Sequence, residues 1–497
     1  MKPSRFTPVV ESLEPRQLLA GAPWVVRVNF QPAGVAVPDY HRADIGYAYA
    51  LRSNGLTYGW DADNTAHVRD RNAANAPDQR YDTLNHMQKS GDRRWEIAVP
   101  SAGQYSVRVV AGDPSYADSV YRINVEGVLT ASGTPTSAAR WVEGTKTVTV
   151  NDGRLTISNA GGAVNNKLAF VEIAMVYTDT PTTPATLGKI AWTSAASHAV
   201  PRTEHMSAMV GGKLYLLGGY IDGKYLSVAR LDAYNPATNS WTRLPDMPQK
   251  LSHAGTAADD RYIYLAGGYT VDSTGTRQAF GLKTARRYDT LTGQWSLLPD
   301  LPLALGAGSM VLLGRTLYYM GGLDRSMNTY ANVWSLNLDA TTPTWTTRAS
   351  LPEPNNHFGA VVLDGKVYTV GGQSGNDNTA VFKRSCYRYD PATNRWSAIA
   401  SLATPPRSHV GPSTLVHAGK IIVLGGETDG PAVGRVASVK AVEVYDPATN
   451  RWSTNTSLPA ARSGGTAASW NGKLVFTTGL SFGVFCREMW IGTFQPR

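Results

Sequence analysis

Short apolar segments alternate with turns rich in glycine, asparagine and aspartate along almost the whole chain. In the first half, segments such as VVRVNF (25–30) and QYSVRVV (104–110) place apolar residues at about every second position. In the second half, LYLL (214–217) and IIVL (421–424) are apolar throughout. Alternation predicts strands with one buried face, and short continuous runs predict strands buried on both faces. The pattern therefore predicts an all-β protein with two kinds of sheet.

Double glycines follow the continuously apolar segments at a regular spacing. Five pairs and a degenerate sixth copy occur: Gly218-Gly219, Gly267-Gly268, Gly321-Gly322, Gly371-Gly372, Gly425-Gly426 and Gly479-Leu480. Each of the five pairs is followed by a tryptophan, namely Trp241, Trp295, Trp345, Trp396 or Trp452. A spacing of about 50 residues is the kelch period. Residues 188–497 therefore resemble a kelch-repeat β-propeller.

The octapeptide YDPATNRW occurs twice, at 389–396 and at 445–452. We interpret it as the hairpin between the third and fourth strands of a blade. Asp390 is suited to accept hydrogen bonds from the turn, and Asn394 tolerates the left-handed backbone that such hairpins need. Trp396 is expected to pack between neighbouring blades. The repetition thus predicts an architectural role and no chemistry.

The ends of the repeat region predict how the ring closes. The last repeat lacks its own turn and tryptophan, but residues 189–205 align with residues 394–409 of the fourth repeat. Trp192 then takes the place of the sixth blade tryptophan. The N-terminal side therefore supplies the outer strand of the last blade, as expected of propellers. This predicts a six-bladed kelch β-propeller.

Residues 24–177 precede a Pro/Thr-rich linker at 178–187 and predict an antiparallel β-sandwich. VRVNF, YGWD (58–61), WEIAVPSAGQYSVRVVAGD (95–113) and NNKLAFVEI (165–173) resemble malectin-like, carbohydrate-binding jelly rolls of secreted bacterial proteins. The resemblance implies a jelly-roll β-sandwich with a carbohydrate partner.

A sugar site needs an aromatic face for the sugar ring and carboxylates or amides for its hydroxyls. The candidate glycan-binding residues are Tyr58, Trp60, Asp61, Asp63, Asp113, Tyr116, Asn165 and Asn166. Two alternatives stay open. The aromatic residues can belong to the core while the acids form turns, or Asp61 and Asp63 can hold a structural calcium ion.

Residues 1–23 do not contain the apolar stretch of an ordinary signal peptide. LEPRQLLA at 13–20 instead resembles the LEPR-xLL segment at the N-termini of planctomycete secreted and surface proteins. This resemblance implies an extracellular or cell-surface protein. No apolar run approaches the length of a membrane span.

Composition and charge narrow the function classes. The chain is 42% hydrophobic and 17% charged, with 48 glycines and a net charge of +9. The positive surplus lies in residues 188–497, without a lysine or arginine run or a nucleic-acid-binding motif. We therefore expect a basic surface and no nucleic-acid partner, with acidic saccharides as an alternative ligand class. Cys386 and Cys486 fall in different repeats, so we predict no disulfide framework and no zinc motif.

Four histidines occupy similar places in the repeats, 13 to 16 residues before a double glycine: His205, His253, His357 and His409. This places them at one rim of the central channel. Four imidazoles around a channel can bind a transition metal, but the spacing varies. The histidines can instead hydrogen-bond the neighbouring blade. We therefore expect no metal and no cofactor.

Two enzymatic resemblances compete with a binding role. IIVLGGETDG (421–430) resembles the last blade of the six-bladed kelch mutarotase acting on N-acetylneuraminate. That resemblance implies acid–base roles for Glu427, Arg202, Arg407, Arg462 and the rim histidines. Galactose oxidase also joins a sugar-binding sandwich to a kelch propeller. Its cross-linked Cys–Tyr pair does not fit Cys386 and Tyr387, because adjacent strand residues point to opposite faces.

We therefore expect a secreted or surface binding protein. Its sandwich binds a glycan, and its propeller binds a protein or an acidic saccharide. Convergence of Glu427, His205, Arg407 and His409 on one pocket would favour the mutarotase alternative.

Overall fold

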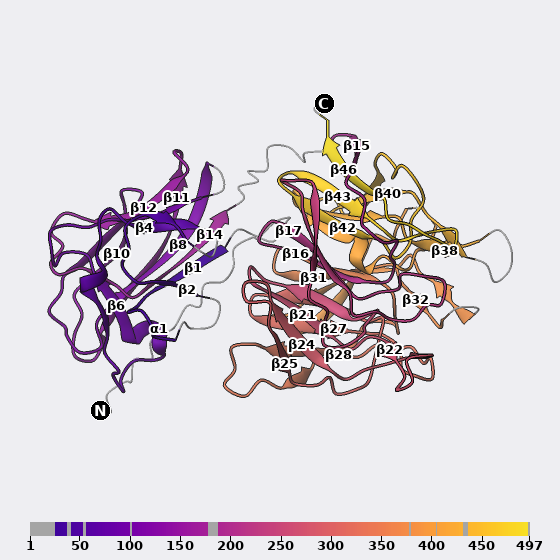
Figure 1. Cartoon of the computed structure of the whole chain (residues 1–497), viewed down its shortest axis with the longest axis horizontal. Coiled ribbons are helices and arrows are strands. Elements are labelled where there is room, and N and C mark those ends of the chain that lie inside the picture. The colour runs from indigo at the N-terminus through magenta and orange to yellow at the C-terminus, as the bar shows by residue number, and fades with distance from the viewer. Residues whose placement is uncertain are drawn as a thin grey trace. The chain divides into compact units, whose positions relative to one another are not determined.

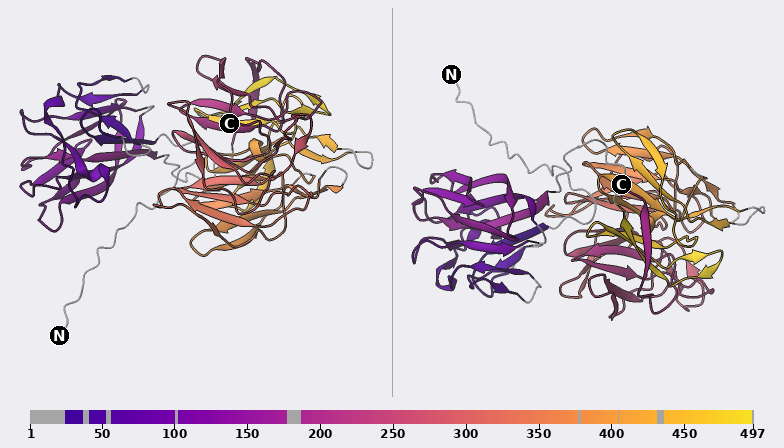
Figure 2. Two further views of the ribbon diagram at one scale, coloured as in Figure 1. Left: turned by 60° about the horizontal axis from the view of Figure 1, so that its bottom comes forward. Right: turned by 90° about the horizontal axis from the view of Figure 1, so that it is seen from above.

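The computed structural model describes residues 25–36, 41–52, 56–99, 102–176, 187–376, 379–403, 405–430 and 436–495. The chain divides into two compact units, Pro23–Thr180 and Pro181–Arg497. Strands dominate both units (Figures 1 and 2). The LEPR-xLL-like segment at 1–23 and nearly all of the linker at 178–187 lie outside the described residues. The predicted all-β class is confirmed.

The described residues of the N-terminal unit form two large sheets and one small sheet. The first is ordered β11 (Trp141–Val150), β8 (Gly103–Gly112), β14 (Phe170–Val176), β1 (Val25–Phe30) and β2 (Arg42–Asp44). The second is ordered β10 (Val128–Gly133), β9 (Tyr121–Val125), β12 (Arg154–Asn159), β7 (Trp95–Ala98), β4 (Thr57–Trp60) and β3 (Ala50–Leu51). The small sheet contains β13 (Lys167–Leu168), β6 (Thr83–His86) and β5 (Val68–Asp70).

One hydrophobic core joins the two large sheets. It includes Val28 and Val107 from the first sheet and Trp95 and Ile157 from the second. The two sheets therefore bury their apolar faces against each other, as the alternating segments predict. One pairing differs from the predicted antiparallel arrangement, because β1 runs parallel to β2. The short helical elements η1 (Thr65–His67) and α1 (Gln79–Asp82) lie between strands of this unit.

Six four-stranded antiparallel sheets are present among the described residues of the C-terminal unit, and we call them blades one to six. Blade one contains β16 (Met206–Val210), β17 (Lys213–Leu217), β18 (Leu231–Asn235) and β19 (Ser240–Leu244). Blade two contains β20 (Gly255–Ala258), β21 (Tyr262–Ala266), β24 (Ala285–Asp289) and β25 (Trp295–Leu298). Blade three contains β26 (Ser309–Leu313), β27 (Thr316–Met320), β28 (Val333–Asn337) and β29 (Trp345–Thr347).

Blade four contains β30 (Gly359–Leu363), β31 (Lys366–Val370), β34 (Cys386–Asp390) and β35 (Arg395–Ile399). Blade five contains β36 (Thr414–His417), β37 (Lys420–Leu424), β40 (Val442–Asp446) and β41 (Arg451–Thr454). Blade six contains β42 (Thr466–Trp470), β43 (Lys473–Thr477), β46 (Met489–Phe494) and β15 (Ile190–Ala195). The turn η3 (Gly411–Ser413) precedes β36.

The first strands of the blades contact one another around a closed ring. Contacts join β16 to β20, β20 to β26, β26 to β30, β30 to β36, β36 to β42, and β42 back to β16. The outer strand of blade six is β15, which pairs with β46 over the whole of β15. The segment containing Trp192 therefore supplies this strand, as the alignment of 189–205 predicts.

A separate hydrophobic cluster fills each of the six gaps between successive blades. In β17, Leu214 and Leu216 pack towards blade six, whereas Tyr215 and Leu217 pack towards blade two. Successive strand residues point to opposite faces. A strand between two neighbouring blades is therefore buried on both sides, which explains why the second strands are apolar throughout.

The repeated octapeptide fastens blades four and five to the blades before them. Asn394 has a φ of 52°, and its Oδ1 accepts hydrogen bonds from Tyr389 and from the backbone N–H of Ala349 in the preceding blade. The Trp396 indole donates to the carbonyl of the same Ala349. Asp390 accepts a turn hydrogen bond from the N–H of Ala392. The predicted architectural role is confirmed.

The double glycines bring successive blades into backbone contact. Gly371 and Gly372 have φ values of 59° and 99°, and Gly372 donates a hydrogen bond to the carbonyl of Arg407 in the next blade. A Cβ on Gly371 would lie 2.4 Å from that carbonyl oxygen. In blade six the equivalent pair is Thr478-Gly479, one residue before the predicted Gly479-Leu480. The N–H of Gly479 donates to the carbonyl of Arg202 in the next blade, as the second glycine of the other pairs does.

Asn450→Ala tests the fastening between blades four and five. Asn450 has a φ of 51° and accepts from Tyr445 and from the N–H of Ala400. We expect a loss of about 2–3 kcal/mol in unfolding free energy, from the left-handed backbone and the lost hydrogen bonds. Chemical denaturation measures this. Asn450→Gly keeps the backbone and should cost less, and the exposed Thr449→Ala serves as the control. Equal stability of Asn450→Ala and the control would contradict the prediction.

Candidate functional site

One residue at the start of each blade has a left-handed backbone. These six residues are Glu204, His253, Ala307, His357, His409 and Gly464, with φ values between 50° and 58°. Each lies two or more residues before the first strand of its blade, so the six lie together at one end of the ring of first strands. We call this set the rim ring. Left-handed non-glycine residues are costly, and they concentrate at functional sites.

Backbone hydrogen bonds link the members of the rim ring from blade to blade. The N–H of His253 donates to the carbonyl of Glu204 at 3.3 Å, and the N–H of Ala307 donates to His253 at 2.8 Å. His357 donates to Ala307 at 2.8 Å, and Val410, the residue after His409, donates to His357 at 3.4 Å. Gly464 donates to His409 at 3.4 Å, and Glu204 donates to Gly464 at 3.2 Å. The backbone thus holds the six Cα positions in a fixed circle.

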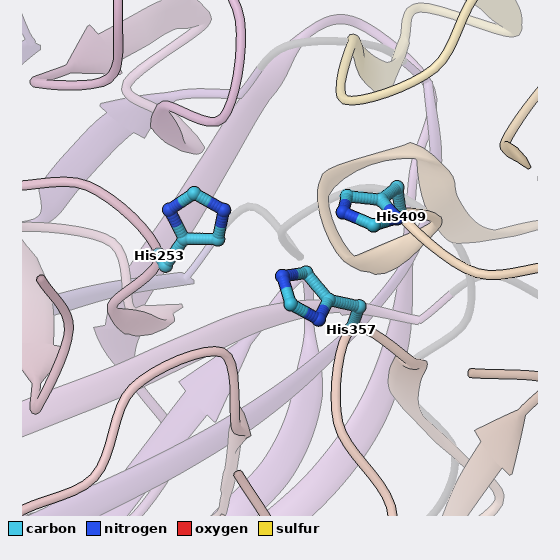
Figure 3. A group of neighbouring side chains, drawn as sticks. All are labelled: His253, His357 and His409. Atoms are coloured by element: carbon cyan, nitrogen blue, oxygen red, sulfur yellow. The ribbon is translucent and has the colours of Figure 1, made fainter. Parts of the chain in front are cut away.

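Three of the four predicted rim histidines converge inside this ring. Figure 3 shows His253, His357 and His409 turned towards one another. One ligand nitrogen from each lies within 4.8 Å of the others. The rings of His357 and His409 stack with their centroids 4.1 Å apart, and His253 meets His357 edge-on at 5.2 Å. Burial holds the pKa of His253 and His357 well below the usual value, so both imidazoles are neutral at pH 7.

Two carboxylates accompany the histidines. Glu204 Oε2 lies 3.3 Å from His253 Nε2, and Glu427 Oε2 lies 3.0 Å from His409 Nδ1. Burial raises the pKa of Glu204 to about 7; nearby His409 opposes this shift, and the charge of Glu427 adds to it. The site thus combines hydrogen-bonded imidazoles and carboxylates, the groups used for proton transfer and for metal ligation.

The fourth predicted histidine, His205, is not part of the rim ring. It is buried, and its Nε2 lies 2.7 Å from Thr478 Oγ1. Burial holds its pKa well below the usual value. Its neighbour Glu204 occupies the ring position instead. The spacing could have shown this, because Glu204 lies 14 residues before Gly218, as His253 does before Gly267.

The three predicted rim arginines do not reach the channel. Arg202 and Arg407 are fully buried and pair with Asp232 and Glu443, the third-strand acids of their own blades. Arg462 pairs with Glu488 at 2.9 Å. Of the residues expected to converge in a mutarotase, His409 and Glu427 are in contact, whereas His205 lies against Thr478 and Arg407 pairs with Glu443.

Several predicted glycan-binding residues lie in the core of the sandwich. The Trp60 indole is fully buried and donates to Asp44 at 3.0 Å, and Tyr58 donates to the carbonyl of Ala43. Asp113 is buried between Arg71 and Lys167, and buried Asn166 bonds to the backbone of Arg122. Asp63 accepts from the N–H of Thr65 in a turn, and Asp61 is exposed. The aromatic residues of YGWD are therefore structural.

The other two predicted loops meet at one exposed place. Tyr116 is 52% exposed, with the Arg71 guanidinium 4.9 Å from the centre of its ring. Asn165, at a φ of 55°, donates to Asp118 and lies 3.2 Å from His86 Nδ1. Lys167 also pairs with Asp118. Tyr116, Asn165 and Asp118 thus combine an aromatic face with amide and carboxylate groups.

Among the described residues of the propeller, small hairpins follow the double glycines in four blades. They are β22 (Thr270–Val271) with β23 (Gln278–Ala279), β32 (Gln373–Ser374) with β33 (Val381–Phe382), β38 (Glu427–Asp429) with β39 (Val436–Ser438), and β44 (Leu480–Ser481) with β45 (Val484–Phe485). Figure 1 shows β22, β32 and β38 along one side of the unit. Within each blade the first and second strands are antiparallel, so the end of the second strand lies beside the start of the first. The hairpins follow the second strands and the rim ring precedes the first strands, so both lie on the same face of the propeller.

This hairpin face exposes large apolar side chains. Phe482, Val484 and Val381 are 69%, 66% and 63% exposed. A groove of about 590 Å³ beside β33 is lined by Val381, Phe382, Lys383 and Arg384, among others. No helix of the described residues is long and apolar enough to cross a membrane.

Comparison with known proteins identifies the repeats. Residues 252–479 match the model of the KLHDC2/KLHL20/DRC7 kelch-repeats domain, and residues 201–248 match the kelch motif. The solved structure of YjhT matches with a TM-score of 0.50 at 15% identity and covers 60% of this chain and 96% of that one. At this identity the likeness concerns the fold alone. The chain is therefore a kelch-repeat protein, and its C-terminal unit has the kelch-type β-propeller fold.

The curated relatives share this repeat region. Kelch-like protein terF of Aspergillus terreus is 29% identical over 60% of this chain and 65% of its own length. Kelch repeat-containing protein At3g27220 of Arabidopsis thaliana is 26% identical over 59% of this chain and 71% of its own. Mouse kelch-like protein 36 is 32% identical over 41% of this chain. This chain spans 33% of the length of the mouse protein and 65% of that of terF.

Asp232→Asn tests the buried arginine of blade one. Burial by itself would raise the pKa of Asp232, but hydrogen bonding to His198 and the charge of Arg202 lower it to about 2. At pH 7 the substitution should cost about 3–5 kcal/mol of unfolding free energy, because it leaves Arg202 buried without a counter-charge.

The pH dependence follows from the lowered pKa. The stabilisation is complete above about pH 4, the value for an unfolded aspartate, and is lost as the pH falls towards 2. The difference between wild type and variant should therefore shrink over that range in urea denaturation. The exposed Asp246→Asn in the same blade is the control, expected to cost about 0.5 kcal/mol or less. A pH-independent difference would contradict this account.

Proposed function

We propose that the protein is a binding protein whose propeller captures a protein partner on the hairpin face. The observation that carries this proposal is the exposure of large apolar side chains on hairpins that share this face. Val381 lines the groove in blade four together with Lys383 and Arg384, and Phe482 and Val484 lie on the hairpin of blade six. Exposed apolar patches mark interaction sites on folded proteins. The kelch-type fold supports the same role, since kelch propellers commonly bind proteins.

We further propose that the sandwich unit binds a glycan around Tyr116. The exposed tyrosine ring beside Asn165 and Asp118 offers a stacking face and groups for sugar hydroxyls. The malectin-like segments support this role. The LEPR-xLL resemblance at 1–23 supports action outside the cell or at its surface. The mutarotase alternative has less support, because Arg407 pairs with Glu443 and His205 lies against Thr478.

The double variant Phe482→Asp, Val484→Asp tests the hairpin face. We expect it to lose a partner that the wild-type chain retains from an extract of the source organism, because two buried apolar contacts would become charged. Aspartate suits the left-handed backbone of Phe482, whose φ is 49°. Leu291→Asp is the matched control, since Leu291 is an exposed apolar residue of a third-to-fourth-strand turn on the opposite face. Retention of the same partner by all three proteins would contradict the proposal.

Tyr116→Ala tests the glycan site in the full-length chain. On a glycan array that includes acidic polymers, we expect the wild-type signal to fall roughly tenfold or more, because the stacking face is removed. Tyr47→Ala is the control, since Tyr47 is equally exposed in the same unit but lies in another loop. No binding by the wild type, or equal loss in the control, would contradict glycan recognition at Tyr116.

A further inference from the structure

We propose that His253, His357 and His409 form a binding site for one transition-metal dication within the rim ring. The three ligand nitrogens already lie within 4.8 Å of one another. This departs from the sequence-based expectation that the protein holds no metal. The proposal does not depend on the protein-binding role, because it rests on the inner residues of the rim ring and not on the hairpins.

The backbone fixes the positions of the three Cα atoms from which the imidazole side chains project. All three residues have φ values of 52° or 53°, and the blade-to-blade hydrogen bonds hold the circle in place. His253 in blade two and His409 in blade five occupy opposite positions in a ring of six. Ala307 in blade three and Gly464 in blade six are also opposite each other and carry the smallest side chains of the ring. They leave the centre to the imidazoles and to Glu204.

Each histidine is oriented through its Nδ1 by the residue before it in the sequence. Ser252 Oγ lies 3.0 Å from Nδ1 of His253, Asn356 Oδ1 lies 2.6 Å from that of His357, and Ser408 Oγ lies 2.9 Å from that of His409. A metal-bound histidine characteristically uses its second ring nitrogen for such a bond. The arrangement leaves Nε2 of each ring as the ligand atom.

The tautomer of His357 follows from the hydrogen bonds of Asn356. The amide nitrogen of Asn356 donates to the carbonyl of Gly375 at 3.1 Å and to Thr329 Oγ1. Its Oδ1 therefore faces His357, and Oδ1 can only accept. His357 Nδ1 must carry the proton, so the Nε2 lone pair is available to a metal.

The two carboxylates complete the site. Glu427 accepts from Ser463 through Oε1 and contacts His409 Nδ1 through Oε2, an outer contact that places the proton on Nδ1 and the lone pair on Nε2. Glu204 lies 3.3 Å from His253 Nε2 and can contribute a fourth ligand oxygen. Two carboxylates would also balance the charge of a dication in this buried position.

The ligand set selects the metal class. Three imidazoles suit Zn²⁺, Co²⁺, Ni²⁺ or Cu²⁺, whereas Mg²⁺ and Ca²⁺ prefer oxygen ligands. Zinc–nitrogen bonds of about 2.0–2.1 Å place tetrahedral ligands about 3.3 Å apart. One nitrogen of each ring lies within 4.8 Å of the others, so metal binding requires these distances to shrink by about 1.5 Å at most. The stacked rings of His357 and His409 must also turn so that their lone pairs point at one ion.

The test titrates the metal-free full-length chain with Co²⁺ and follows visible absorption, then displaces Co²⁺ with Zn²⁺. We expect one equivalent of Co²⁺ per chain, with the ligand-field bands of a nitrogen-ligated site, and full displacement by one equivalent of Zn²⁺. Mg²⁺ should not displace it. Absence of ligand-field bands, or displacement by Mg²⁺, would overturn the proposal.

Asparagine is the replacement of choice at the ligands, because it tolerates the left-handed backbone that alanine does not. His357→Asn and His409→Asn should each abolish the one-equivalent Co²⁺ spectrum. Glu427→Gln should weaken the affinity about 10–100-fold while one equivalent still binds. His417→Asn is the control, since His417 is a buried propeller histidine that stacks on Phe494 away from the ring.

Circular dichroism and a melting curve establish that each variant is folded before titration. A folded His357→Asn or His409→Asn that retains the wild-type spectrum would place the metal elsewhere and overturn the proposal. The proposal would also be overturned if His417→Asn lost Co²⁺ binding to the same degree as His357→Asn and His409→Asn.

Discussion

The contact between successive blades is the constraint on which the propeller depends. No blade buries its apolar surface alone, because each second strand is covered on both faces by its neighbours. The octapeptide supplies the polar half of this contact. Its asparagine and tryptophan bond the N–H and the carbonyl of one residue, Ala349 or Ala400, in the preceding blade. Polar fastening at the outer edge and apolar packing inside act on the same interface.

Closure of the ring creates the site. The circle of inner hydrogen bonds closes where β42 of blade six meets β16 of blade one, and β15 completes blade six at its outer edge. Six left-handed residues then face a common axis, and the side chains at those positions are free to differ. Blades one, two, four and five carry Glu204, His253, His357 and His409, whereas blades three and six carry Ala307 and Gly464. Chemistry is therefore concentrated in a ring whose scaffold is repetitive.

The buried charges follow the same logic. Arg202 and Arg407 lie in equivalent places, two residues before the rim ring, and each pairs with the third-strand acid of its own blade. They bond the carbonyls of Gly218 and Gly425, the first glycine of each pair. Arginine there stabilises the turn into the double glycine. Arg202 and Arg407 are thus structural residues, although they lie next to the rim ring in the sequence.

The sequence by itself determined the repeat, the blade hairpin with its left-handed asparagine, and the closing strand with Trp192, because these depend on local backbone geometry and a fixed period. It also placed His253, His357 and His409 at one rim. The 14-residue spacing to the double glycine also places Glu204, and not His205, in the ring. Only the tertiary structure decided that His253, His357 and His409 converge, because their side chains meet only when the ring of blades is closed. It likewise buried Trp60 and Asp113 and left Tyr116 exposed, because burial depends on which loops meet at the end of the sandwich.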